Sequence, residues 1–266
     1  GQMSMNYKGA VFFDYDGTLT DVAAGIPVTT QATRQAMRRL RANGYLAMLC
    51  SGRAVSYASE SGAEFDGMVT SNGTYVTVNG EEILNCPVEA ETMRRFTARL
   101  DAMGIAYGID NPVRCLTPDI QAPYFLKWLE TYSIPAKAFR QIEPNETPVG
   151  YKFSVLYHND EEIRALREEF GGLVFACQRT SNCADVTVRG FDKSVGVKAV
   201  IERFHLPVES TYAFGDGEND LSMFKAVGHG VAMGDHAALL EPYAAFITRR
   251  VCDEGIEYGL KHFGLI

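Results

Sequence analysis

Short apolar runs alternate with amphipathic stretches in the first part of the chain. The apolar runs are almost free of polar residues, which is typical of strands buried on both faces of a parallel sheet. The stretch opened by Thr29-Thr30 has apolar positions at helical spacing, and Gly44 follows it as a stop signal. We expect strands at 9–14, 45–50 and 67–70, with helices between them at 31–43 and 54–61. This β-α-β-α-β order predicts a doubly wound parallel sheet.

The same alternation returns near residue 193 and continues to the end of the chain. Here we expect helices at 193–204, 219–226, 236–242 and from 253, and strands at 211–214, 229–232 and 245–248. Because parallel strands need helical crossovers, this pattern indicates a second half of the same sheet.

The middle of the chain has a different, mixed pattern. Two short apolar runs flank Asn79-Gly80, which predicts a hairpin over 75–84. Beyond it we expect helices at 89–103, 121–133 and 160–170, and strands at 105–109, 151–157, 173–178 and 184–188. The sequence therefore predicts a discontinuous core domain, residues 1–84 and 189–266, interrupted by an inserted α+β domain, residues 85–188. Hinges are expected at 79–87 and 189–192.

Acidic residues follow two of the expected core strands. Asp14 and Asp16 end the first strand, and Asp216 and Asp220 follow the strand at 211–214. Ligands of open α/β sheets bind outside the carboxyl ends of the strands, and a cluster of carboxylates there favours a hard cation such as Mg²⁺. One carboxylate can attack an electrophile while another moves a proton. The alternative is a pair of ordinary polar turns.

Other polar residues stand at the ends or starts of neighbouring elements. Ser51-Gly52 leads into a helix, where a hydroxyl and backbone N–H groups can bind an anion, although Ser51 alone is also a common N-cap. Lys193 begins a helix, where a cation is unfavourable, so a phosphate contact is one explanation and an exposed lysine the other. Asn72 lies at the end of a strand, where an asparagine is typical of a turn.

Composition narrows the class of protein. Of the 266 residues, 46% are apolar and 22% charged, and the formal net charge is −8. This balance is that of a globular protein and argues against general binding to nucleic acid or a membrane surface. The six cysteines form no C-x-x-C pair, so we expect buried free thiols and a cytoplasmic protein. No apolar stretch reaches 18 residues, and no triphosphate-binding P-loop is present.

As an ordered set, four short segments resemble the motifs of phosphatases of the haloacid dehalogenase (HAD) superfamily. They are Asp14-x-Asp16-Gly17-Thr18, then Ser51, then Lys193, then Gly215-Asp216-Gly217-Glu218-Asn219-Asp220. The insert is similar to the type IIB cap of the Cof-type subfamily, and Val231-Ala232-Met233-Gly234 resembles a segment that follows the last motif there. The resemblance covers essentially the whole chain. It implies a Rossmann-like α/β core, with a doubly wound parallel sheet, and a cap that determines substrate specificity.

The resemblance also implies a mechanism. Asp14 would be the nucleophile that forms an aspartyl-phosphate, and Asp16 would be the acid and base. Mg²⁺ would be held by Asp14, the Asp16 backbone carbonyl and Asp216. Phosphate would be bound by Thr18, Ser51, Gly52, Lys193 and Asn219. Asp220 and Asn72 would hold these residues in place without binding the phosphate themselves.

Substrate choice would then depend on the insert. The candidates are Lys152, Arg114, Arg179 and Asn182, each of which is also an ordinary surface or sheet residue. The expected partner is a small soluble phosphomonoester, a hexose or pentose phosphate. A phosphomutase and a non-catalytic metabolite-binding protein are the alternatives. The identity of the sugar and the oligomeric state are left open.

Overall fold

The chain folds into two units. The computed structural model describes residues 6–178 and 181–266. The first unit comprises the chain up to Gly52 together with Ala58–Asn85 and Asp192–Ile266; the second comprises Arg53–Tyr57 and Cys86–Phe191. Compared with the expected insert at 85–188, the second unit therefore extends to Phe191 and also takes a short segment from the first half of the chain.

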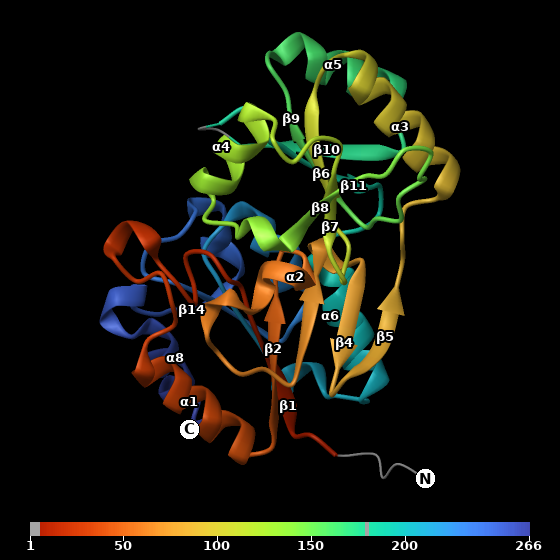
Figure 1. Ribbon diagram of the computed structural model, residues 1–266. Coiled ribbons are helices and arrows are strands. Elements are labelled where there is room, and N and C mark those ends of the chain that lie inside the picture. Colours follow the sequence, from red (N-terminus) through yellow and green to blue (C-terminus); the bar gives the residue numbers. More distant parts are fainter. Residues whose placement is uncertain (1–5, 179–180) are drawn as a thin grey trace. The chain divides into compact units, whose positions relative to one another are not determined.

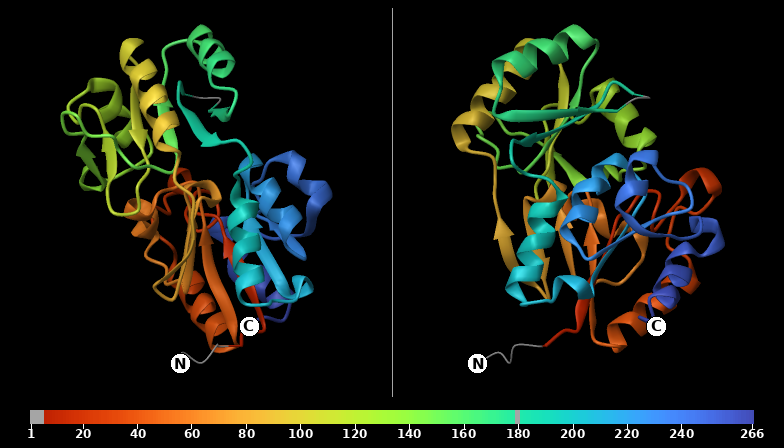
Figure 2. Two further views of the ribbon diagram at one scale, coloured as in Figure 1. Left: turned by 90° about the vertical axis from the view of Figure 1, so that its right-hand side faces the viewer. Right: turned by 180° about the vertical axis from the view of Figure 1, so that it is seen from behind.

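An eight-stranded sheet forms the centre of the first unit, in the order β14-β13-β12-β1-β2-β3-β4-β5. Its strands are β1 (Gly9–Phe13), β2 (Tyr45–Cys50), β3 (Gly67–Thr70), β4 (Tyr75–Val78), β5 (Glu81–Asn85), β12 (Thr211–Gly215), β13 (His229–Ala232) and β14 (Ala244–Ile247). The six strands from β14 to β3 are parallel, and β4 and β5 continue the sheet antiparallel. The β1–β12 pairing joins the two ends of the chain in one sheet, as Figures 1 and 2 show in red and blue.

Helices cover both faces of this sheet. Val11 and Phe13 pack with α1 (Gln31–Ala42) and α8 (Gly255–His262) on one face. Their neighbours Ala10 and Phe12 pack with α6 (Lys193–Arg203) and α7 (Leu221–Ala226) on the other. Side chains alternate between faces along a strand, so an apolar run supplies both cores. The doubly wound α/β fold is confirmed.

Several further helical segments are short. They are η1 (Val22–Ala24), α2 (Val55–Ala58), η2 (Ser59–Ser61), η3 (Ser71–Gly73), η4 (Ala136–Ala138), η5 (Val208–Ser210), η6 (Glu218–Asp220), η7 (Ala238–Tyr243) and η8 (Val251–Asp253). The helix expected at 236–242 is instead the 3₁₀ segment η7, which contains Pro242. Proline lacks an N–H and clashes with the preceding turn, so an α-helix cannot form through it without a kink.

The second unit has a six-stranded sheet in the order β10-β11-β9-β6-β7-β8. Its elements are α3 (Ala90–Ala102), β6 (Ala106–Ile109), β7 (Cys115–Thr117), α4 (Pro123–Thr131), β8 (Phe139–Gln141), β9 (Phe153–Leu156), α5 (Asp160–Glu169), β10 (Leu173–Cys177) and β11 (Ala184–Val188). Phe96 of α3 and Leu166 of α5 pack with Phe153 and Val186 on one face of this sheet. The β7 and β8 strands were not expected, because three residues are too few to show a two-residue period.

All six cysteines lie in the described part of the chain and are free thiols. Cys50, Cys115 and Cys183 are buried as expected, whereas Cys177 and Cys252 are exposed. Among the described helices, none is both long enough and apolar enough to cross a membrane.

Candidate active site

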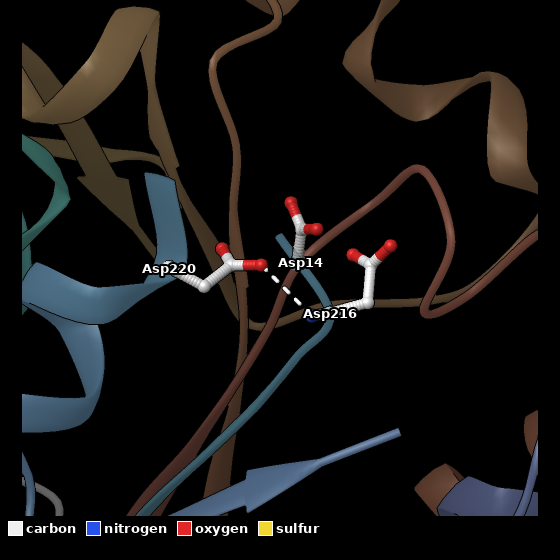
Figure 3. A group of neighbouring side chains, drawn as sticks. All are labelled: Asp14, Asp216 and Asp220. Atoms are coloured by element: carbon white, nitrogen blue, oxygen red, sulfur yellow. Dashed lines mark hydrogen bonds between the residues drawn. The ribbon is translucent and has the colours of Figure 1, made fainter. Parts of the chain in front are cut away.

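Three carboxylates meet at the carboxyl ends of β1 and β12. Asp14 follows β1 and Asp216 follows β12, and the two strands are parallel neighbours in register. The backbone N–H of Asp14 donates to the carbonyl of Phe214 at 3.0 Å, which extends this pairing to the site. One carboxylate oxygen from each of Asp14, Asp216 and Asp220 lies within 4.8 Å of the other two, and Figure 3 shows the three side chains together. Residues distant in sequence thus form one acidic cluster.

Gly17 allows the loop after β1 to approach Asp216 closely. Its φ is +82°, and a Cβ at this position would lie 2.0 Å from Oδ2 of Asp216. Only glycine fits this combination of backbone conformation and contact. The next residue, Thr18, is fully buried and its hydroxyl donates to Asp216 Oδ1 at 3.4 Å. Asp16, in the same loop, is exposed.

Lys193 links two of the carboxylates. Its buried ammonium group donates to Asp14 Oδ1 at 2.8 Å and to Asp220 Oδ1 at 2.7 Å. The other oxygen of Asp220 accepts from the backbone N–H groups of Asp216 and Gly217, at 3.0 and 3.1 Å. Asp220 therefore holds the lysine and the loop, and one oxygen from each of the three carboxylates lies close enough to the others for the group to hold a metal ion.

The electrostatics of this cluster favour an added cation. Burial, followed by the nearby Asp220 carboxylate, holds the pKa of Asp14 well above its usual value. Burial also raises the pKa of Asp216, to about 6. Burial alone would lower the pKa of Lys193, but Asp14 and Asp220 together raise it. Three carboxylates against one ammonium leave an excess of negative charge, and carboxylate oxygens are ligands that Mg²⁺ prefers.

The candidate phosphate-binding residues Ser51 and Gly52 follow β2. The Ser51 N–H donates to the Val69 carbonyl at 2.8 Å, and its own carbonyl accepts from Asn72 N–H at 3.3 Å. Asn72 has a left-handed backbone (φ 54°), and its Oδ1 would lie 3.1 Å from a Cβ at Gly52. The ends of β2 and β3 are therefore packed tightly together.

The turn after β3 is also packed against the start of α6. A Cβ at Gly73 would lie 2.0 Å from the carbonyl oxygen of Asp192, so only a glycine fits here. Asp192 is the N-cap of α6, and its side chain accepts from the Ser194 N–H at 2.9 Å. The close approach of Gly73 to Asp192 fixes the start of α6. The Lys193 side chain extends from this end of the helix to the carboxylates. Asn219 is exposed, and its Oδ1 would lie 3.2 Å from a Cβ at Gly217.

The four candidates in the second unit lie in different surroundings. Arg114 is exposed and its Nε donates to the Lys137 carbonyl at 3.3 Å. Asn182 is exposed and donates to the His158 carbonyl at 3.0 Å. Lys152 is only 2% exposed, so its ammonium is buried within the unit. Arg179 lies outside the described residues.

A cavity of about 600 Å³ is found in the second unit. This volume suits a small-molecule ligand. Aromatic rings, two charged groups, amides and hydroxyls line it: Tyr124, Lys127, Trp128, Thr131, Tyr132, Leu156, Tyr157, Asp160, Gln178, Ser181, Asn182 and Cys183. Of the three sequence-based candidates that the structure describes, Asn182 is among these residues.

Sequence reasoning missed a buried charged group in the second unit. Lys152 Nζ lies 3.2 Å from Asp185 Oδ1 and 3.7 Å from Asp110 Oδ2. Tyr57, from the segment between β2 and β3, is 3% exposed, and Asp110 and Lys152 both influence its pKa. No local sequence pattern around Lys152 identifies partners that lie so far away in the chain.

Comparison with known proteins identifies the family. A model of the haloacid dehalogenase-like hydrolases matches residues 11–260. The chain belongs to this family. Its members are enzymes, so the prediction of a hydrolase of the HAD superfamily is confirmed.

Individual relatives agree with this assignment. A curated protein of Bacillus subtilis (strain 168), named "Putative phosphatase YkrA", is 29% identical and aligns over 96% of this chain and 98% of its own length. This likeness supports the predicted phosphatase. A solved structure of a Geobacillus kaustophilus HTA426 protein of hypothetical status is 28% identical, with a TM-score of 0.84 over 98% of this chain and all of that chain.

A third comparison concerns the fold alone. The structure of BT4131, described as a HAD subclass IIB sugar phosphatase, has a TM-score of 0.80 at 24% identity and covers 97% of this chain and 99% of its own. The resemblance to capped members of the family is thereby confirmed for the architecture. Sequence similarity at this level does not carry that protein's substrate over to the chain.

Proposed function

We propose that this HAD hydrolase is a Mg²⁺-dependent phosphomonoesterase that acts on a small sugar phosphate, a hexose or pentose phosphate, through a phosphorylated Asp14. The observation that carries the proposal is the Asp14 carboxylate, which is paired with the buried Lys193 and lies within 4.8 Å of the Asp216 and Asp220 carboxylates. Such a constellation supports covalent catalysis by a carboxylate beside a metal ion.

The proposed reaction has two steps. In the first, an Asp14 oxygen attacks phosphorus, the bond from phosphorus to the sugar oxygen breaks, and Asp16 gives its proton to that oxygen. In the second, Asp16 takes a proton from water, the water oxygen bonds to phosphorus, and the Asp14–phosphorus bond breaks. Both steps need a proton carrier next to the nucleophile, and the exposed Asp16 is two residues from Asp14.

The remaining residues of the site would bind the phosphoryl group and the metal ion. Lys193 and the Ser51–Gly52 turn would hold phosphoryl oxygens, with Thr18 and Asn219 supporting them. The metal would be held by the Asp14 and Asp216 carboxylates and the Asp16 carbonyl. When bound, Mg²⁺ offsets the negative charge that builds up on the phosphoryl oxygens. Asp220 keeps Lys193 in place, because it accepts from the lysine and from two loop N–H groups.

Two observations support a sugar as the leaving group. A structural neighbour is described as a sugar phosphatase. The second unit has a cavity lined by aromatic rings and polar groups, a composition that suits a polyol. We further propose that this unit selects the substrate. The cytoplasmic location stays a prediction.

The proposal is tested by phosphate release from a panel of sugar phosphates, nucleotides and small phosphorylated acids, with Mg²⁺ and with EDTA. We expect metal-dependent release that is strongest with hexose or pentose phosphates and absent in Asp14→Asn. Release from nucleotides alone would refute the sugar substrate, and near-wild-type kcat in Asp14→Asn would refute the nucleophile. Transfer of phosphate between positions of one sugar, followed by ³¹P NMR, would indicate a phosphomutase instead, and no reaction with any compound would indicate a binding protein.

A further inference from the structure

The segment that follows β13 lies against the backbone of Asp216. The Asp216 carbonyl accepts from the Ala237 N–H at 2.8 Å. The carbonyl just before it, that of Gly215, accepts from the Met233 N–H at 3.0 Å. The Asp216 N–H in turn donates to the Asp220 carboxylate at 3.0 Å (Figure 3). Both backbone groups of Asp216, proposed above as a metal ligand, are therefore held, one by Asp220 and the other by Ala237.

A histidine joins the two ends of this segment, which we call the 233–237 loop. His236 Nδ1 lies 2.7 Å from the Met233 carbonyl oxygen. A carbonyl only accepts, so Nδ1 is the donor in this bond. The bond connects the start of the loop, which is bonded to Gly215, with its end, where Ala237 is bonded to Asp216. It therefore fixes how far apart the two N–H groups lie that donate to the end of β12.

The middle of the loop is packed against the chain that follows β14. The Gly234 N–H donates to the Arg249 carbonyl at 3.0 Å, and a Cβ at Gly234 would lie 2.6 Å from the Arg250 nitrogen. In the part of the chain that the structure describes, no hydrogen bond other than that of His236 joins Met233 to the end of the loop. The shape of the loop at Asp216 thus depends on this side chain.

The other nitrogen of the ring has a partner of a different kind. His236 Nε2 lies 3.0 Å from Oε1 of Glu241, in η7. The side chain of His236 is 9% exposed and that of Glu241 is 57% exposed. An ion pair with an exposed carboxylate contributes little, whereas a buried carbonyl that loses its donor has a larger cost. Met233 is 1% exposed, so we expect its bond with the ring to be the important one.

We propose, on the basis of the metal-dependent function above, that His236 is a positioning residue for Asp216. Its bond to the Met233 carbonyl holds the 233–237 loop, and the loop holds the Asp216 carbonyl, so that the Asp216 carboxylate is kept in place for Mg²⁺. His236 itself contacts neither the metal nor the substrate. Every residue of this path belongs to the first unit. Replacing groups that hold a metal ligand in place lowers metal affinity by about 10–100-fold.

The test compares two amide variants that differ in which bond of the ring they retain. In His236→Asn, the amide nitrogen stands where Nδ1 does along the side chain, so the bond to Met233 is retained and the contact with Glu241 is lost. In His236→Gln, the nitrogen stands where Nε2 does, so the reverse holds. The matched control is His158→Ala, which breaks a histidine–glutamate pair of the second unit, joined at 3.1 Å to Glu162.

Mg²⁺ binding is measured by titration calorimetry without substrate, and stability by urea unfolding in EDTA. We expect His236→Gln to bind Mg²⁺ about tenfold more weakly than wild type, and His236→Asn and the control to bind it equally well. The Mg²⁺ concentration for half-maximal hydrolysis of p-nitrophenyl phosphate should rise by the same factor in His236→Gln. The KM for this substrate at saturating Mg²⁺ should be unchanged, because the phosphate-binding residues are not affected.

Equal Mg²⁺ affinity in wild type and His236→Gln would overturn the proposal, even if the variant were less stable in urea, since the loop would then be structural only. Equally weak binding by both amide variants would overturn it as well. Should His236→Gln fail to fold, Glu241→Ala decides: it removes the outer contact alone, so a tenfold loss of Mg²⁺ affinity there would contradict the role of the Met233 bond, and wild-type affinity would support it.

The same experiment separates this proposal from the proposed function. A wild-type protein that binds Mg²⁺ but releases no phosphate from any compound would refute the phosphatase, whereas the comparison of Mg²⁺ affinities would still decide the role of His236. A wild-type protein that binds no Mg²⁺ would overturn the positioning role.

Discussion

Asp14→Asn is expected to stabilise the metal-free protein while abolishing turnover. Asp14 has two carboxylates within 4.8 Å and one ammonium at 2.8 Å. At an effective dielectric constant of about 20, each repulsion is about 3.5 kcal/mol and the attraction about 6 kcal/mol. The repulsions together slightly exceed the attraction, and burial of the charge adds a further cost.

An asparagine removes this charge and keeps an oxygen that accepts from Lys193. We therefore expect the free energy of unfolding in EDTA at pH 7.5 to rise by about 1–3 kcal/mol. Saturating Mg²⁺ should stabilise wild type and have much less effect on the variant. A native active site that is less stable than its inactive variant is a recognised cost of function.

The assay is urea unfolding followed by circular dichroism, with and without Mg²⁺. Asp235→Asn, which neutralises an exposed carboxylate, is the control and should change stability by less than about 0.5 kcal/mol. A loss of more than about 1 kcal/mol for Asp14→Asn in EDTA would refute the reasoning, since it would mean that the lysine outweighs both repulsions.

Three further predictions concern the same cluster. Gly17→Ala should lower kcat at least about a hundredfold, because its Cβ would displace Asp216, and phosphate release measures this. Asp220→Asn should cost about 3–5 kcal/mol in urea unfolding and also abolish activity, since an asparagine can offer its one oxygen to Lys193 or to the backbone N–H groups of Asp216 and Gly217, but not to both. In EDTA, Asp216→Asn should match wild type near pH 4 and exceed its stability above about pH 6: a carboxyl whose pKa is raised to about 6 destabilises the fold once it ionises, by on the order of 3 kcal/mol.

Each of these has a control or a contradicting outcome. Gly80 has a similar φ of +78° but open space around it, so Gly80→Ala should lose about 1 kcal/mol and keep full activity. An Asp220→Asn protein as stable as wild type would show that the buried ion pair is not needed. A stability difference between Asp216→Asn and wild type that does not change with pH would exclude the raised pKa.

The sequence alone predicted those helices and strands that are determined by a pattern of neighbouring residues. The apolar runs at Tyr45–Cys50 and His229–Ala232 predicted β2 and β13 within one residue, because strands buried on both faces leave an unbroken apolar run. Thr30 caps α1 as expected, accepting from the Thr33 N–H. Asn79 and Gly80 both have positive φ, as the hairpin turn requires.

What the sequence could not predict depends on contacts between distant segments. The carboxylates could be expected at one sheet edge, but not the division of Lys193 between Asp14 and Asp220. Nothing in the local pattern around Lys152 indicates that it pairs with Asp110 and Asp185. Their partners are fixed by how the strands are ordered in the sheet, and sequence spacing carries no information on that order.

The pairing of β1 with β12 has a consequence for how the protein is made. Thr18 and Asp216 are in contact although 198 residues separate them. During synthesis from the N-terminus, Asp14 is made early, but its partners Lys193, Asp216 and Asp220 arrive only in the last third of the 266 residues. In the meantime, the segment between them can fold through more local contacts. The closing of so long a loop is intrinsically slow. A growing chain that has not yet reached Asp216 therefore lacks two of the three clustered carboxylates.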